Sequence, residues 1–100
     1  MLHTVNKSPF ERNALDACLA RVGKGSAILL FEDAVYAATK RTAPGGKVAS
    51  AAKDFKIFVL GPDLKARGYD ESQVVEGVTI VDYSGFVDLV VEHGPVSAWL

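Results

Sequence analysis

The sequence predicts a small α/β domain with a mostly parallel sheet of about four to five strands flanked by helices. Short apolar runs recur at Ala27–Phe31, Lys56–Leu60 and Val78–Val81. The run at Ala27–Phe31 is uninterrupted, and a short continuous apolar run is typical of a strand buried on both faces, as in parallel sheets covered by helices. Segments of helical length separate the runs, which favours βαβ crossovers. With 100 residues, the chain has a common size for one domain, so we expect residues 1–100 to form a single domain.

The first strand and helix are predicted from the N-terminal quarter of the chain. Leu2–Val5 predicts a short strand. Ser8, Pro9 and Glu11 form a capping-box pattern that starts a helix, which we expect to reach about Val22. One face of that helix carries apolar residues at helical spacing, namely Phe10, Ala14, Leu15, Ala17, Cys18, Leu19 and Val22. The glycines at positions 23 and 25 end it.

The strand at Ala27–Phe31 leads directly into Glu32 and Asp33. Carboxylates at a strand–helix junction favour a side-chain cap on the free N–H groups of the helix that follows. We therefore expect a second helix over residues 34–38, capped by this acidic pair. Pro44, Gly45 and Gly46 predict that Thr39–Gly46 is a loop.

The second half of the chain predicts shorter helical pieces and two further strands. Ala-rich Lys47–Lys53 predicts a short helix, and the strand at Lys56–Leu60 follows it. Asp63–Arg67, ended by Gly68, and Asp70–Val75 predict helical turns. Val78–Val81 predicts the fourth strand. The order of the strands in the sheet does not follow from these patterns.

The C-terminal segment predicts a helix and a final extended piece. Asp82 or Ser84 caps the helix, which ends near His93. Val96–Leu100 predicts a terminal strand or an extended arm. Trp99 either docks this strand at the edge of the sheet or contacts another subunit.

Composition bounds the cellular setting and the partners. The single cysteine allows no disulfide within the chain, which fits a reducing cytoplasmic location. No apolar run reaches the roughly 18–20 residues of a membrane span, so we expect no membrane contact. The hydrophobic fraction of 49% is high for a small domain, and such a surplus indicates apolar surface kept for a protein partner.

Acidic residues gather where strands are expected to end. Glu32, Asp33, Asp63 and Asp82 follow three different strands, and ligands of open α/β sheets bind at that edge. Together they would form a cation pocket of the receiver type. Separately, each would cap a helix, which the local preferences of strand–helix junctions favour. One cysteine and two scattered histidines lack metal-ligand spacing, and no phosphate-binding loop follows a strand. We therefore expect neither a metal nor a cofactor.

Cys18 is the one thiol available for nucleophilic chemistry. Reactive thiolates usually sit at helix N-termini or beside cations, where their pKa is lowered. Cys18 instead falls near the middle of the apolar face of the first predicted helix. The two interpretations are a small apolar residue, in the core or facing a partner subunit, and a thiol that handles sulfur.

Four ordered segments carry a family pattern, and they are Met1–Phe10, Leu30–Ala37, Val59–Gly68 and Val81–Leu89. Together they resemble the DsrH/TusB family of DsrE-like sulfur relay proteins. The similarity covers the full chain, including the terminal Ala98-Trp99-Leu100, and is closer to DsrH than to typical TusB. The resemblance implies a DsrE-like α/β fold.

The resemblance also implies partners and a role. It implies a heterohexamer with DsrE/TusD-like and DsrF/TusC-like subunits, two copies of each, that relays sulfur as a cysteine persulfide. The principal acceptor cysteine lies on the DsrE/TusD-like subunit, and a DsrC/TusE-like protein accepts the sulfur. Such complexes serve either cytoplasmic sulfur oxidation or 2-thiolation of the tRNA wobble uridine. Some DsrH members carry a cysteine in the first helix, and Cys18 matches that position.

These considerations lead to one expected function and two alternatives. We expect a non-catalytic or accessory subunit of the relay, with no direct contact to nucleic acid. In the first alternative, Cys18 itself carries the persulfide. In the second, the chain is a stand-alone receiver-like module that binds through its acidic pocket.

Overall fold

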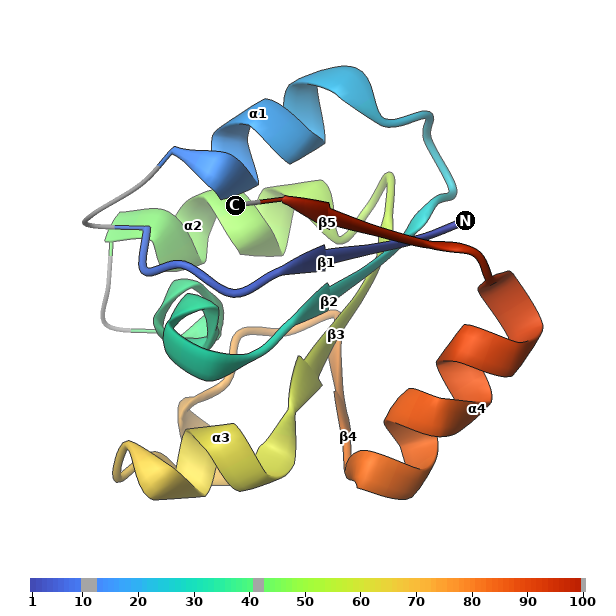
Figure 1. Ribbon diagram of the computed structural model, residues 1–100. Coiled ribbons are helices and arrows are strands. Elements are labelled where there is room, and N and C mark those ends of the chain that lie inside the picture. The colour runs from blue at the N-terminus through green and yellow to red at the C-terminus, as the bar shows by residue number, and fades with distance from the viewer. Residues whose placement is uncertain (10–12, 41–42, 100) are drawn as a thin grey trace.

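The computed structural model describes residues 1–9, 13–40 and 43–99. Its centre is a five-stranded sheet in which every neighbouring pair of strands is parallel (Figure 1). The strands are β1 (Leu2–Val5), β2 (Ala27–Leu30), β3 (Lys56–Leu60), β4 (Val78–Val81) and β5 (Val96–Trp99). The spatial order is β4-β3-β2-β1-β5. The predicted fold class is confirmed.

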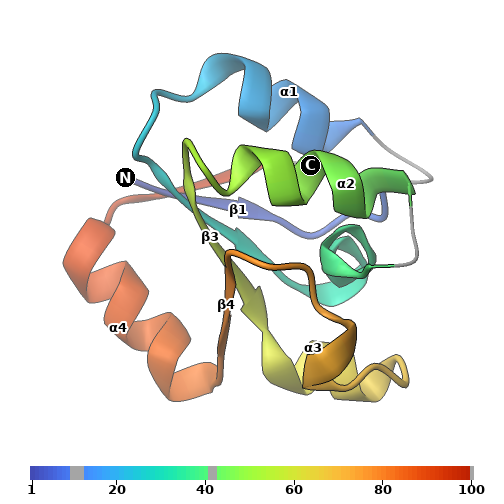
Figure 2. The same ribbon diagram turned by 180° about the vertical axis from the view of Figure 1, so that it is seen from behind.

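The helices lie on both faces of this sheet. They are α1 (Ala14–Arg21), the 3₁₀ helix η1 (Glu32–Ala38), α2 (Ala43–Ala51), α3 (Gly61–Ala66), the 3₁₀ helix η2 (Glu71–Gln73) and α4 (Tyr83–His93). Figures 1 and 2 show α1 and α2 on one face and α4 on the other. From β1 to β4 the chain moves stepwise towards one edge, whereas the connection through α4 returns across the sheet to β5. Because parallel crossovers share one handedness, this reversal of direction moves α4 to the opposite face.

The larger core lies between one face of the sheet and the helices that cover it, which are α1, η1, α2 and α3. Ile28 and Leu30 of β2 and Ile57 and Val59 of β3 point into it. On the other face of β2, Ala27 and Leu29 pack in a smaller core. All four residues of β2 are buried, which explains the unbroken apolar run of this strand.

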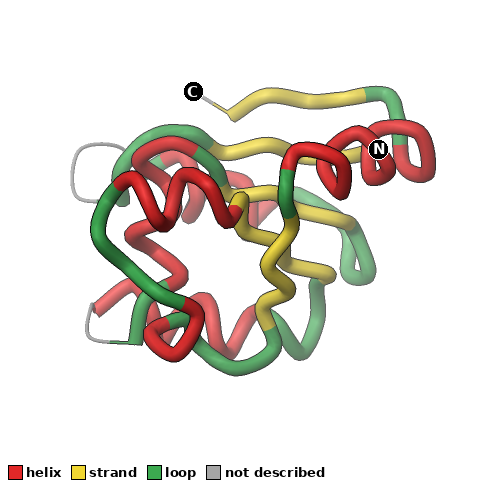
Figure 3. Tube along the Cα trace, turned by 90° about the horizontal axis from the view of Figure 1, so that it is seen from below, coloured by secondary structure: helices red, strands yellow, loops and turns green. Residues whose placement is uncertain are grey.

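The smaller core lies under α4. Its buried members are Leu2, Ala27, Leu29 and Leu89. Seen from below, α4 lies by itself on its side of the sheet (Figure 3). Within the described residues, this face therefore depends on one helix for its cover, while several helices cover the opposite face.

Two predicted helix boundaries are wrong. α1 begins at Ala14 after the N-cap residue Asn13, so Ser8 and Pro9 precede the helix. The Asn13 side chain makes no capping hydrogen bond, and Glu11 of the predicted capping box lies outside the described residues. α2 begins at Ala43, so residues 43–46 of the predicted loop are helical. Proline costs little in a first helical turn, and burial of Val48 in the larger core outweighs the weak helix propensity of the glycines.

The C-terminal strand is docked at the sheet edge beside β1, as one interpretation of Trp99 predicted. Trp99 packs against the larger core, and its Nε1–H donates to Nδ1 of His3 at 3.2 Å. That nitrogen must be unprotonated to accept. Burial lowers the pKa of His3 from its ordinary value of 6.5, with a smaller contribution from the N-terminal ammonium group. Leu100 lies outside the described residues.

Candidate functional site

Cys18, the predicted candidate for sulfur chemistry, is fully buried in the larger core. Its position on the inner face of α1 is the one that the apolar spacing predicted. Burial raises the pKa of the thiol to about 11, because the charged thiolate is poorly solvated there. The side chain therefore stays a protonated thiol near neutral pH. Its position matches a small core residue, and its reaction with sulfur stays a prediction.

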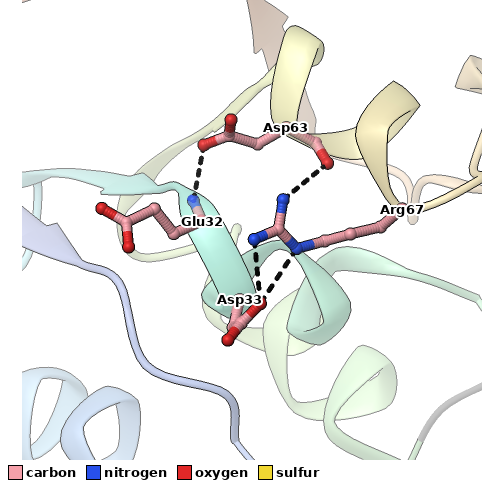
Figure 4. Close-up of polar contacts among 4 residues, drawn as sticks. All are labelled: Glu32, Asp33, Asp63 and Arg67. Atoms are coloured by element: carbon pink, nitrogen blue, oxygen red, sulfur yellow. Dashed lines mark hydrogen bonds and ion pairs between the residues drawn. The ribbon is translucent and has the colours of Figure 1, made fainter.

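We call Glu32 and Asp33, which follow β2, the acidic elbow, and its backbone is unusual. Glu32 adopts φ 49, and within the described ranges it is the non-glycine residue with positive φ. Its backbone N–H donates to Oδ2 of Asp63 at 2.6 Å (Figure 4). A left-handed conformation costs an ordinary residue on the order of 1–2 kcal/mol, so this hydrogen bond helps to hold the elbow.

The predicted role of Glu32 and Asp33 as caps is therefore wrong. The helix η1 has no side-chain cap at its own N-cap residue, Phe31. The carboxylate that meets the first N–H group comes from Asp63 on α3, which begins directly after the neighbouring strand. Parallel strands bring such residues to one edge although they are far apart in sequence.

Arg67 ties this elbow to the end of α3. Its Nε and Nη2 atoms donate to Oδ1 of Asp33 at 3.0 and 2.9 Å, and Nη1 donates to the backbone oxygen of Asp63 at 3.2 Å (Figure 4). The Arg67 side chain is only 22% exposed, whereas that of Asp33 is 53% exposed. Asp33 thus has a cation as its partner, and Arg67 is a member of the site that the sequence reasoning did not select.

A helix-ending motif positions Arg67. Gly68, at φ 82, donates its N–H to the backbone oxygen of Lys65 at 3.0 Å, and Tyr69 donates to that of Leu64 at 3.1 Å. This pair of bonds is the Schellman motif, in which a glycine takes the left-handed position after the last helical turn. The predicted end of the helical turn at Gly68 is confirmed. The sequence reasoning used Asp63–Arg67 and the glycine that follows only to predict the helical turn, although this pattern also places Arg67 in the last turn beside the acidic residues.

Asp82 belongs to a different part of the same sheet edge. It caps α4 by accepting from the Gly85 N–H at 2.7 Å, so Asp82 rather than Ser84 is the cap. It lines an open hollow of about 560 Å³ beside the ends of β3 and β4. Across the part of the chain that the structure describes, no group of three His, Cys, Asp or Glu side chains is placed to hold a metal ion. The four carboxylates do not gather into a receiver-like pocket.

A second hollow, of about 590 Å³, adjoins the first and shares Gly61, Lys65, Glu71 and Ile80 with it. Asp70 at its rim is engaged in capping η2, and hydrogen bonds from Ser72 hold the pKa of that carboxyl below its usual range. The carboxylates along this edge mainly cap helices or pair with Arg67. Such an arrangement stabilises the fold.

The helices of the described ranges include none that is both long and apolar enough to span a bilayer.

The comparison with known protein families decides the identity. A family model described as "DsrH like protein" matches residues 7–96. The chain belongs to the DsrH-like family. The family predicted from the four sequence segments is therefore confirmed.

Relatives of this DsrH-like chain carry the name TusB. The TusB protein of Pectobacterium parmentieri is 40% identical, and the alignment covers 99% of this chain and 100% of the relative. TusB of Escherichia coli (strain K12) is 33% identical with the same coverage. Whether this chain is functionally closer to DsrH or to TusB stays a prediction. This family membership supports a role as a subunit of a sulfur relay.

A solved structure confirms the fold independently. A protein of unknown function from Methanobacterium thermoautotrophicum superposes with a TM-score of 0.68, covering 97% of this chain and 95% of that one. At 15% identity, the match concerns the fold alone.

Proposed function

We propose that this DsrH-like chain is a non-catalytic or accessory subunit of a cytoplasmic persulfide relay. It assembles with DsrE/TusD-like and DsrF/TusC-like subunits in a heterohexamer, and a DsrC/TusE-like protein receives the sulfur. The observation that carries the proposal is the family match over residues 7–96. Sulfur oxidation and tRNA wobble-uridine 2-thiolation are both compatible with this role.

The environment of Cys18 supports an accessory rather than a sulfur-carrying role. A persulfide carrier needs an accessible thiolate that attacks the sulfur donor. Cys18 is fully buried, and with a pKa of about 11 its thiolate fraction at pH 7 is on the order of one in ten thousand. For Cys18 to react, α1 would have to move away from the sheet. The reactive cysteine of the relay therefore belongs to another subunit.

The sheet edge supports the same role. The elbow at Glu32 is held by Asp63, and Arg67 holds Asp33. These contacts join η1 to α3, so the ends of β2 and β3 are fixed relative to one another. A rigid edge of this kind presents a constant surface to neighbouring subunits, which lowers the entropy cost of assembly.

Co-expression tests the proposal. The chain carrying an affinity tag is expressed together with candidate DsrE-like and DsrF-like proteins from the same genome, and the mass of the purified material is measured by light scattering. We expect all three proteins in one complex of defined mass. Elution of the tagged chain as a stable monomer, with both candidates folded and present, contradicts the proposal.

A further inference from the structure

The exposed apolar side chains of this protein are concentrated on one side of the sheet. Among the described residues, the large apolar side chains that are exposed are Met1, Tyr83, Val87, Val91 and Val96. Three of them lie on α4, where Tyr83 and Val87 are each 61% exposed and Val91 is 82% exposed. Val96 points to the same side as α4, because its partner in the β1–β5 register is Leu2, a member of the smaller core.

On α4 these residues form a continuous strip. Residues four apart lie above one another on a helix, so Tyr83, Val87 and Val91 line up along it. With the partly buried Phe86 and Val90 they line an open hollow of about 290 Å³. We call these five residues the α4 patch. Leu89, Phe86 and Val90 already pack in the smaller core, so the exposed strip exceeds what the fold itself requires.

An acidic row borders the α4 patch. Asp88 and Glu92 are exposed and four residues apart, so they line up along α4. Each directly follows one of the exposed valines, Val87 and Val91, so the acidic row runs beside the apolar strip. Glu92 has His93 as its neighbour, at 3.7 Å between Oε1 and Nε2. Residues 68–100 contain six acidic residues and no lysine or arginine. The complementary partner surface is therefore apolar and bordered by basic side chains.

The negative charge of the acidic row also distinguishes between the proteins that could bind the α4 patch. A second copy that used the same surface would bring further carboxylates and no cation from its own α4. A different protein that carries lysine or arginine beside an apolar surface would cover the apolar strip and pair its cations with the acidic row. Electrostatic complementarity of this kind selects partners and speeds their encounter.

We propose that the α4 patch is the surface through which this chain docks a partner subunit of the relay, and that this subunit presents an apolar surface bordered by lysine or arginine. The inference rests on the proposed function, since it names the docking surface of that same complex. α4 contributes in two ways: its inner face closes the smaller core, and its outer face binds the partner.

A double substitution, Val87→Asp with Val91→Asp, tests the docking surface. Both positions are exposed, so the fold is expected to persist, and circular dichroism with urea unfolding checks this. The matched control is Ala20→Asp with Ser50→Asp, two exposed positions on α1 and α2 across the sheet. Affinity for the purified partner subunits is measured by calorimetry. We expect the α4 variant to bind at least about tenfold more weakly, because apolar anchors dominate interface energies, while the control binds within about twofold of the unmodified chain.

A second variant keeps the apolar strip and reverses the acidic row. Asp88→Lys with Glu92→Lys places cations against the basic border expected on the partner. We expect this variant to bind more weakly than the unmodified chain at low salt. Its affinity should rise with added salt, which screens the repulsion between like charges, whereas the affinity of the unmodified chain should fall. Because both side chains are exposed, it tests the proposal even if the valine variant fails to fold.

The outcomes separate the docking surface from the proposed function. If the unmodified chain binds the relay subunits and both folded α4 variants bind them as tightly as the unmodified chain does, the role of the α4 patch as the docking surface is refuted and the proposed function stands. If the unmodified chain binds neither subunit, both proposals fall. If the unmodified chain dimerises alone and the valine variant is monomeric, the occupant is a second copy, and the proposed partner is overturned.

Discussion

Asp63→Ala is the substitution that most directly perturbs the elbow between β2 and η1. Oδ2 of Asp63 accepts the Glu32 N–H at 2.6 Å, and Glu32 has the positive φ of 49. Alanine removes this acceptor, whereas the contact from Arg67 uses the backbone oxygen of residue 63 and is retained. The substitution therefore isolates a single hydrogen bond between α3 and the elbow.

The expected cost follows from this geometry. Hydrogen bonds to charged acceptors contribute roughly 1.5–3 kcal/mol, and loss of an N-cap side chain costs about 0.5–2 kcal/mol. Because the elbow is exposed, water replaces part of the lost bond, so we expect the free energy of unfolding to fall by about 1–2 kcal/mol. For a domain of this size, that lowers Tm by roughly 4–16 °C.

Urea unfolding followed by circular dichroism measures the effect, with two comparison variants. Asp63→Asn keeps an oxygen acceptor and is expected to recover more than half of the loss. Asp33→Ala removes the 53%-exposed partner of Arg67, and exposed ion pairs contribute at most about 1 kcal/mol, so its cost is smaller. The reasoning is refuted if Asp63→Ala is as stable as the unmodified chain, or if Asp63→Asn is equally destabilising.

Three further predictions concern single groups. At pH 8, Cys18 in the native protein should be alkylated at least about 100-fold more slowly than in urea, as measured by mass spectrometry. The reason is that raising the pKa of the thiol from 9.0 to about 11 lowers the thiolate fraction by that factor. Equal alkylation rates in the two conditions would contradict the burial of Cys18. Glu32→Gly should raise the free energy of unfolding by about 0.5–1 kcal/mol, because glycine adopts the positive φ without strain; a lower urea midpoint would contradict the positive φ. Because the pKa of His3 is lowered in the native protein, the unfolded chain binds a proton at this histidine more readily than the native chain does. The contribution of neutral His3 to the free energy of unfolding is therefore complete above pH 6.5 and is lost as the pH falls towards the native pKa. In His3→Asn the decrease in urea midpoint between pH 7.5 and 5 should be smaller, and the fluorescence of Trp99, the single tryptophan, should no longer titrate with this group; unchanged titration would exclude His3 as its cause.

The strands were predictable because short stretches of sequence already indicate their burial. The apolar run of β2 reflects cover on both faces, which a short window already indicates. The strand order was not predictable, because it depends on the long connection through α4 that returns from β4 to β5. The loop expected at residues 43–46 shows the converse, since packing of the helix against the core overrode local composition there.

The candidate site was predictable in location and not in its bonding. The acidic residues after β2, β3 and β4 were expected at one edge of the sheet, and they lie there. Their bonds were misassigned because the partners are distant: Asp63 lies 31 residues from Glu32, and Arg67 lies 34 residues from Asp33. The surplus of apolar residues indicated a partner surface. Only the packing of α4 distinguishes its exposed valines from those that fill the smaller core.

Sulfur transfer by the reconstituted complex tests the central claim, that this chain supports the relay without carrying sulfur. The complex is assembled with either the unmodified chain or Cys18→Ala, and labelled sulfur reaching the DsrC/TusE-like acceptor is measured over time. The account predicts that Cys18→Ala transfers sulfur within about twofold of the unmodified rate, because a buried small side chain is replaced by another, and that omitting the chain abolishes assembly and transfer. Loss of transfer in an intact complex containing Cys18→Ala would contradict the account and make Cys18 a member of the relay.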